Sequence, residues 1–273
     1  MERLKYMKST IAVWAGVVLS TFSVEAAPLF TESFGNLSEG AGITTNNTIL
    51  TYARAGTGVG SYLNARNPGS FPGASALLLA TSSSLTGLGV VNGTYTPFDV
   101  GTFAFSFHTP DSFAVANDLF AFVGSGNTFS GNSAFSGNDL TAGFAISSGQ
   151  LQTRNALNAW ANVGPALSPD TSYELHIVFN GSGSAVSYDS GSVGAGAADI
   201  WLDGVLFGDD VSIRDMVGVS AFRIYMTGSA SATPYEVDNI RLYDSPLSVP
   251  EPAPAAFGLA GGVLLALTRW RKR

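Results

Sequence analysis

A run of aspartates in the last third of the chain is the clearest group of residues that could bind a metal ion. It comprises Asp199, Asp203, Asp209, Asp210 and Asp215. Calcium ions prefer carboxylate oxygens that loops supply. The candidate calcium ligands are therefore Asp199, Asp203, Asp209 and Asp210. The Asp-x-Asp-x-Asp-Gly spacing of an EF-hand loop is absent. The alternative to a calcium site is an acidic hairpin whose carboxylates are solvated. No cofactor other than calcium is indicated.

Glycoside hydrolysis is the main enzymatic chemistry to consider. It requires two carboxylates a few ångströms apart, which many enzymes supply from one strand as Glu-x-Asp-x-Glu because alternate strand residues share a face. Between the two ends of the chain the glutamates are Glu32, Glu39, Glu174 and Glu236, and none lies in such a pattern. Gly-x-Ser-x-Gly and Walker motifs are also absent. We therefore predict a protein that is not an enzyme, with polysaccharide hydrolysis as the less favoured alternative.

The two histidines, His108 and His176, are far apart in the sequence. His176 lies between Leu175 and Ile177 in an alternating segment, so we expect it on the solvent-facing side of a strand. His108 is followed by Thr109-Pro110-Asp111, which indicates a turn. Nothing in this spacing brings both histidines to a shared acid, so neither a histidine metal site nor a catalytic triad is predicted.

Tryptophan side chains can stack on sugar rings, which makes Trp160 and Trp201 candidate glycan contacts. Trp201 alternates with Ile200 and Leu202, and this pattern favours the outer face of a strand. Packing in the core is the alternative for each tryptophan. A carbohydrate-binding role, with or without calcium, is therefore an alternative function for the chain.

The elements that must position these side chains are short strands. Thr102–His108 and Tyr173–Phe179 alternate large apolar residues with small or polar ones, which gives each strand one buried face. Phe222–Met226 and Ile240–Tyr243 repeat the pattern, and Leu119–Val123 is a more continuous apolar run. Turn-forming residues are abundant while glutamate, lysine and methionine are scarce, so helices are not expected in this part of the chain.

Turn residues separate the strands and indicate hairpins. Asp203-Gly204 lies between Ile200–Leu202 and Val205–Phe207, and Ser148-Gly149 lies between two further apolar segments. Asp-Gly flanked by alternating apolar residues is a strong signal for a two-residue hairpin. Many short strands joined by such turns predict an all-β fold, an antiparallel β-sandwich that residues 27–246 form.

The composition of residues 27–248 limits the partners of the chain. They contain six arginines, no lysine, no cysteine and seventeen acidic residues, which gives a formal charge of −11. Without cysteine there are no disulfides, no thiol catalysis and no cysteine-based zinc sites. An acidic, lysine-free body argues against nucleic acid and anionic membrane surfaces as partners, and it is compatible with neutral glycans or divalent cations.

The first 26 residues have the three parts of a secretory signal peptide. Arg3, Lys5 and Lys8 precede a short apolar run, Ile11–Phe22, which is followed by Val24-Glu25-Ala26. This order predicts export with cleavage after residue 26. An uncleaved anchor is the alternative, although the apolar run is short for a membrane span.

The other end of the chain has a proline-containing motif, an apolar segment and a basic tail. These are, in order, Val249, Pro250, Glu251 and Pro252, then Ala253–Thr268, then Arg269, Trp270, Arg271, Lys272 and Arg273. As a transmembrane helix the apolar segment would be about 24 Å long. This is shorter than a ~30 Å hydrocarbon core, but local thinning and snorkelling arginines can offset the difference. The basic tail predicts a cytoplasmic end.

Residues 247–273 resemble the PEP-CTERM sorting signal of Gram-negative bacteria, and Pro250-Glu251-Pro252 matches its Pro-Glu-Pro triplet position for position. The resemblance implies an exosortase as partner and a precursor in the inner membrane. It also implies a mature protein on the cell surface or outside the cell, associated with exopolysaccharide. A plain single-pass anchor, which needs no such triplet, and a GPI signal, which lacks a basic cluster, are the alternatives.

The order of the strand segments is similar to that of laminin-G-like and concanavalin A-like jelly rolls. The likeness rests on Tyr173-Glu174-Leu175, Leu202-Asp203-Gly204 and Asp238–Leu242, and it spans roughly residues 34–244. It implies a jelly-roll body between the signal helix and the transmembrane helix. The combined prediction is an exported, non-enzymatic surface or matrix protein that exosortase processes.

Overall fold

The computed structural model describes residues 26–57, 59–67, 69–81, 85–90, 95–113, 118–125, 140–155, 157, 159–214, 218–227 and 233–247. The predicted signal peptide up to residue 25, the motif at 249–252, the apolar segment and the basic tail lie outside these residues. In the part of the chain that is described, no helix has the length and apolarity needed to cross a membrane.

Two antiparallel sheets form the body. Sheet A has the strand order β15-β14-β11-β6-β17-β4-β3, with β1 also paired to β17, and sheet B has the order β10-β9-β8-β7-β16-β5-β2. The strands of sheet A are β1 (Phe30–Glu32), β3 (Tyr62–Arg66), β4 (Ser75–Leu79), β6 (Val100–His108), β11 (Ser172–Asn180), β14 (Ala197–Leu202), β15 (Val205–Ser212) and β17 (Tyr235–Tyr243). Those of sheet B are β2 (Tyr52–Arg54), β5 (Leu85–Val90), β7 (Asp118–Gly124), β8 (Leu140–Ser147), β9 (Gln150–Arg154), β10 (Trp160–Ala166) and β16 (Ala221–Thr227). A separate hairpin pairs β12 (Val186–Tyr188) with β13 (Gly191–Val193).

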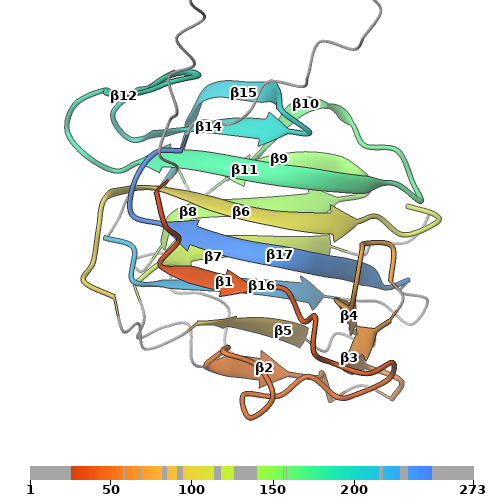
Figure 1. The fold of residues 1–273 in the computed structure, drawn as a ribbon. Coiled ribbons are helices and arrows are strands. Elements are labelled where there is room, and N and C mark those ends of the chain that lie inside the picture. The colour runs from red at the N-terminus through yellow and green to blue at the C-terminus, as the bar shows by residue number, and fades with distance from the viewer. Residues whose placement is uncertain are drawn as a thin grey trace, which may run out of the picture.

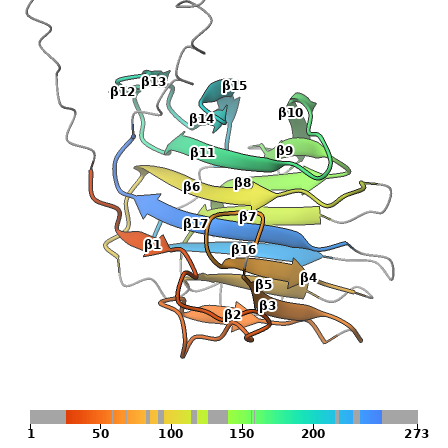
Figure 2. The ribbon, with the colours of Figure 1, turned by 45° about the vertical axis from the view of Figure 1, so that its right-hand side comes forward.

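The two sheets lie face to face as two layers, with sheet A in front of sheet B in Figure 1 and the layers seen more from the side in Figure 2. Many neighbouring strands are far apart in the sequence, as β6 and β17 are, because the chain passes repeatedly between the sheets. This arrangement confirms the predicted all-β antiparallel sandwich, and the strand order agrees with a jelly roll.

The core lies between the sheets and follows from the alternation along each strand. Phe103, Phe105 and Phe107 of β6 point inward and are at most 1% exposed. Phe103 meets Phe222 of the opposite sheet, with 5.2 Å between their ring centroids. Burying a phenylalanine side chain contributes about 1.5–3 kcal/mol, so the interior of the sandwich stabilises the fold without disulfides.

Both predicted two-residue hairpins are present. Ser148 and Gly149, between β8 and β9, have φ values of 50° and 76°, and Asp203 and Gly204, between β14 and β15, have values of 50° and 74°. Two successive residues with positive φ make a type I′ turn, whose twist matches that of the flanking strands. The turn residues therefore determine where these hairpins reverse.

The sequence patterns did not indicate strands β1 to β5, and β5 shows why. Its Gly87 and Gly89 break the apolar alternation that marks a strand. Both positions exclude a side chain, because a Cβ on Gly87 would lie 2.7 Å from Tyr225 Cβ and one on Gly89 would lie 2.9 Å from Arg223 Cα. The glycines allow β16 to approach β5 closely. This need arises from the packing of one strand against the other, so the alternation along β5 does not reveal it.

Candidate functional site

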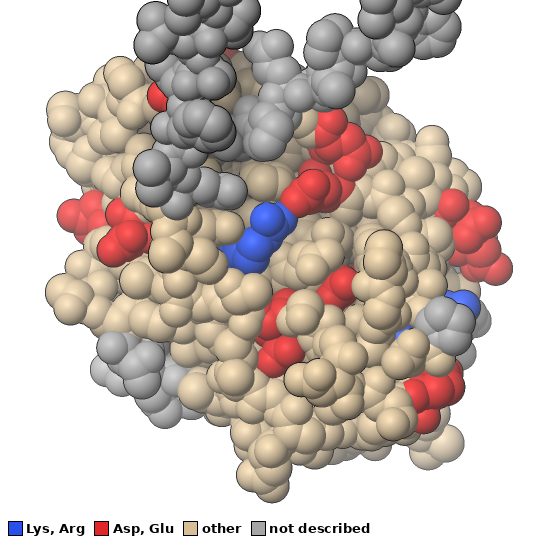
Figure 3. Space-filling view, in the orientation of Figure 1, with Lys and Arg blue, Asp and Glu red and all other residues tan. Residues whose placement is uncertain are grey.

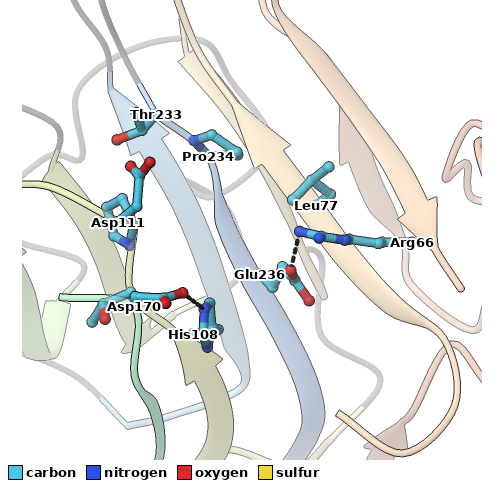
Figure 4. A pocket seen from close by; sticks show the side chains of 10 residues that line it. Arg66, Leu77, His108, Asp111, Asp170, Thr233, Pro234 and Glu236 are labelled. Atoms are coloured by element: carbon cyan, nitrogen blue, oxygen red, sulfur yellow. Dashed lines mark hydrogen bonds and ion pairs between the residues drawn. The ribbon is translucent and has the colours of Figure 1, made fainter. Parts of the chain in front are cut away.

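A pocket of about 310 Å³ opens at one end of sheet A. A row of cross-strand partners runs through it: Ser172 of β11 pairs with His108 of β6, His108 with Glu236 of β17, and Glu236 with Leu77 of β4. These side chains face away from the core because they alternate with the buried residues of each strand. Figure 4 shows the pocket, which is lined by Arg66, Leu77, His108, Thr109, Pro110, Asp111, Asp170, Thr233, Pro234 and Glu236.

His108 occupies the centre of the row and is held on both sides of its ring. Its Nε2 lies 3.1 Å from Asp170 Oδ1, and its Nδ1 lies 2.9 Å from Ser172 Oγ. A neutral imidazole donates from one nitrogen and accepts at the other, and a carboxylate only accepts. The tautomer with its proton on Nε2 therefore satisfies both contacts, because Nε2 donates to Asp170 and Nδ1 accepts from the Ser172 hydroxyl. The side chain is 19% exposed, which leaves one edge of the ring open to the pocket.

Glu236 anchors the opposite side of the pocket. Its side chain is 2% exposed and accepts hydrogen bonds from Arg66 Nη1, from the Ser70 amide at 2.8 Å, and from the hydroxyls of Ser70 and Ser75 at 3.0 Å each. A buried carboxylate is tolerated when a cation and several donors surround it. Arg66, which is 46% exposed, is therefore held in place while part of its guanidinium faces solvent.

The order Ser172–His108–Asp170 resembles the connectivity of a nucleophile, a base and an acid. In catalytic triads the acid is buried and fixes the histidine. Here the Asp170 side chain is 79% exposed, and Ser172 is exposed at the start of its strand. The arrangement is suited to hydrogen bonding with a polar ligand, and it lacks the shielded acid that a triad uses.

The candidate calcium ligands are distributed over two places. Asp199 of β14 is buried, and its two oxygens accept from the Tyr188 hydroxyl at 2.5 Å and the Asp210 amide at 2.9 Å. Asp210 in turn accepts from the Gly194 amide, and Asp203 at the β14–β15 turn accepts from the Glu174 amide.

Asp209 is exposed beside Asp210 on β15. Burial is the largest effect that raises the pKa of Asp199, and the nearby charges of Asp210 and Asp209 raise it further. Among the residues that the structure describes, no group of three or more acids or histidines is placed to hold a metal ion. The structure therefore brings Asp199 and Asp210 together and leaves Asp203 at a separate turn.

Trp201 lies on the outer face of sheet A, as its alternation predicted, but the β12–β13 hairpin covers it. The side chain is 5% exposed and packs with Val178, Val193 and Ala197. Its Nε1 donates to the Tyr188 hydroxyl at 3.1 Å. This burial leaves little ring surface for a sugar.

Trp160 lies on the other layer, at the edge of sheet B. It is half-buried against Phe120 and Phe122, with ring centroids 5.6 and 6.0 Å away, and the guanidinium of Arg154 lies 5.8 Å from its ring centroid. The two tryptophans therefore do not share a site.

His176 was expected at a solvent-facing strand position, and this expectation is wrong in one respect. It does lie on the outer face of sheet A, but it is 8% exposed. Its Nε2 lies 3.0 Å from Glu174 Oε1, and the same oxygen accepts from Arg241. The hydrogen bond from His176, with that from Arg241, lowers the pKa of Glu174 to about 2 although partial burial opposes the change.

Sequence patterns did not indicate the pocket as a group. Arg66, Asp170 and Glu236 come from segments that are far apart in the chain, and each alone resembles an ordinary strand end or turn residue. The available signal was weak: His108 ends one alternating strand, and Asp170 lies two residues before the start of another. Only the antiparallel pairing of β11 with β6 shows that these two ends coincide.

Comparisons with known proteins add similarities of fold. No family model and no curated protein sequence matches this chain. The receptor-binding domain of botulinum neurotoxin type G is 8% identical with a TM-score of 0.46, over 82% of this chain and 49% of that one, so this chain spans about half its length. The carbohydrate recognition domain of Emp46p, in a metal-free form, is 12% identical with a TM-score of 0.44, over 63% of this chain and 82% of that one. Domain 4 of AbnA, a GH43 extracellular arabinanase from Geobacillus stearothermophilus, in complex with arabinotriose, is 13% identical with a TM-score of 0.43. The match covers 82% of this chain and 95% of that one.

Proposed function

We propose that this chain is exported and acts without catalysis on the cell surface or in the extracellular matrix, where its β-sandwich binds a glycan. The observation that carries the glycan proposal is the pocket around His108. Its volume of about 310 Å³ is at the lower end of the range of small-ligand sites, which suits one or a few sugar units.

The groups that line the pocket match the chemistry of sugar hydroxyls, which both donate and accept hydrogen bonds. Arg66 is a donor, and the carboxylates of Asp111 and Asp170 are acceptors. Leu77 and Pro234 add apolar surface for the C–H faces of a sugar ring. Because Glu236 and Ser172 already hold Arg66 and His108, little side-chain freedom is lost when a ligand binds.

A role without catalysis is consistent with the carboxylates of the pocket. Glycoside hydrolysis needs one carboxyl that donates a proton and a second that acts as nucleophile or base. Glu236 is already bonded to Arg66 and two serines, and Asp170 is largely exposed. Glu236 is thus occupied by its own partners, and Asp170 is not enclosed beside a second carboxyl as in a hydrolase pair.

Calorimetry with polysaccharide fragments from the producing cell tests the glycan proposal. We expect His108→Ala and Arg66→Ala each to weaken binding about tenfold, which corresponds to about 1.4 kcal/mol. Asp189→Asn, at the exposed β12–β13 turn, is the matched control and should bind normally. If no fragment binds, the glycan proposal is wrong, and release of reducing ends would favour a hydrolase instead.

Export and sorting are proposed from the two ends of the sequence. The N-terminal segment has the order of a signal peptide, and residues 249–273 resemble the PEP-CTERM signal, which implies exosortase as the partner. Replacing Pro250-Glu251-Pro252 by alanines should leave an uncleaved precursor in the membranes of the native host. Lys272→Arg, which keeps the basic tail, is the control. Normal processing of the alanine variant would refute the sorting proposal.

A further inference from the structure

We propose that the pocket around His108 selects glycans that carry protonated amino groups, such as a hexosamine polymer with free amines. The inference rests on the proposed glycan-binding function and assigns the ligand class of that same site. It follows from the charges that line the pocket and from their placement.

The charges of the pocket do not balance. Arg66 is paired with Glu236, so these two groups contribute no net charge. Asp111 and Asp170 remain, and in the described part of the chain neither carboxylate makes an ion pair with an arginine. Asp170 contacts the imidazole ring of His108. The pocket therefore presents about two negative charges to a ligand.

The excess charge lies on one side of the pocket. Figure 4 shows Asp111 and Asp170 on one side and the Arg66–Glu236 ion pair on the other, with His108 between them. Asp111 follows β6 and Asp170 precedes β11, so both carboxylates project from the loop end of sheet A. An ammonium group can lie beside these carboxylates while neighbouring hydroxyls bond to Arg66. An N-acetyl group would forgo the ionic contact, and a uronate would be repelled.

The charge of the whole body acts in the same direction. Residues 27–248 carry seventeen acidic residues against six arginines. Figure 3 shows acidic side chains distributed over the sheet A face with few cationic ones. Such a field raises the local concentration of a cationic polymer and lowers that of an anionic one. Exposed charges are screened by salt, so the effect depends on ionic strength.

The test compares three oligosaccharides of equal length by calorimetry with the purified protein: oligomers of glucosamine with free amines, the fully N-acetylated oligomers, and oligomers of a uronic acid. The buffer is of low ionic strength and keeps the amines protonated. We expect the free-amine series to bind about tenfold more tightly than the N-acetylated series, and the uronate series to show no binding. The tenfold preference should shrink in high salt.

Two variants locate the preference. Asp111→Asn and Asp170→Asn each remove one charge at an exposed position, and asparagine tolerates the φ of 49° at Asp170. We expect the ratio of the amine affinity to the N-acetyl affinity to fall to near one in each variant, whatever the loss of a carboxylate acceptor does to the binding of both series. Asp189→Asn removes the same charge from the distant β12–β13 turn and should keep the preference.

The outcomes separate this inference from the proposed function. Equal binding of the amine and N-acetylated series would overturn the amine selectivity and leave glycan binding intact. An amine preference that both asparagine variants retain would also overturn it. Failure of all three series to bind, together with failure of host polysaccharide fragments, would overturn both proposals.

Discussion

His108 and Glu236 are direct partners across the neighbouring antiparallel strands β6 and β17. This register places a histidine that is bonded to a loop aspartate beside a buried glutamate that is paired with Arg66. The pocket thus depends on strand pairing that also supports the core, since Phe107 and Val237, the next residues along, are fully buried partners. Changes on the outer face of this row should therefore affect both binding and stability.

Glu236→Gln should lower stability, because it removes the charge that pairs with Arg66 and disturbs the bonds from Ser70 and Ser75. Loss of such a buried network costs about 1–3 kcal/mol. Urea unfolding followed by circular dichroism measures this change, with Asp189→Asn as the control. A midpoint equal to that of the parent protein would contradict the structural role of the ion pair.

Tyr188→Phe tests the link between the β12–β13 hairpin and sheet A. The Tyr188 hydroxyl donates to Asp199 and accepts from Trp201 Nε1. Removing it leaves two buried polar groups without this partner, so we expect a loss of about 1–2 kcal/mol in unfolding free energy. Tyr95→Phe, at a half-buried tyrosine outside this network, is the control in the same thermal unfolding measurement. Equal losses for the two variants would argue against a specific role for the Tyr188 bonds.

Because of the buried carboxyl of Asp238, we expect a particular pH dependence of the stability of the protein. Its side chain is 2% exposed, and burial raises its pKa to about 6. Because the folded state then binds the proton more tightly than the unfolded state, its contribution to stability falls as the pH rises from about 4 to about 6. We expect Asp238→Asn to be more stable than the parent protein by about 1–2 kcal/mol at neutral pH and similar to it near pH 4.

Urea unfolding of both proteins over this pH range measures the Asp238 effect as the difference between two curves. The nearby carboxylate of Glu32, which also raises the pKa of Asp238, is unchanged in the comparison. A difference that stays constant with pH would show that the Asp238 carboxyl is not responsible.

Gly89→Ala tests the close approach of β5 and β16. A Cβ at this position would meet the Phe222 carbonyl oxygen and lie 2.9 Å from Arg223 Cα, and backbone atoms cannot move aside as a flexible side chain can. We expect a loss of about 1–3 kcal/mol in unfolding free energy. Gly183→Ala, where a Cβ meets nothing within 4 Å, is the matched control. Equal stability of the two variants would mean that the strands can separate without cost.

The sequence alone determined the strands whose alternation is strong and the turns whose residues favour positive φ. Phe103, Phe105 and Phe107 are buried on one face as predicted, and Ser148-Gly149 and Asp203-Gly204 form the expected turns. These features depend on neighbours along the chain, because a strand alternates every two residues and a two-residue hairpin needs a particular backbone conformation. The antiparallel sandwich follows from them, since many half-apolar strands must bury their faces against one another.

Which side chains meet on the outer faces depends on the packing of the whole sandwich. Alternation assigns His176 and Trp201 to the outer face, and both are buried there: His176 contacts Glu174, and the β12–β13 hairpin covers Trp201. Likewise, His108 meets Asp170 and Glu236 through the pairing order of β11, β6 and β17, which no local pattern specifies. Strand order and register arise from packing of the whole sandwich. The pocket forms where the ends of strands that are distant in the sequence lie side by side.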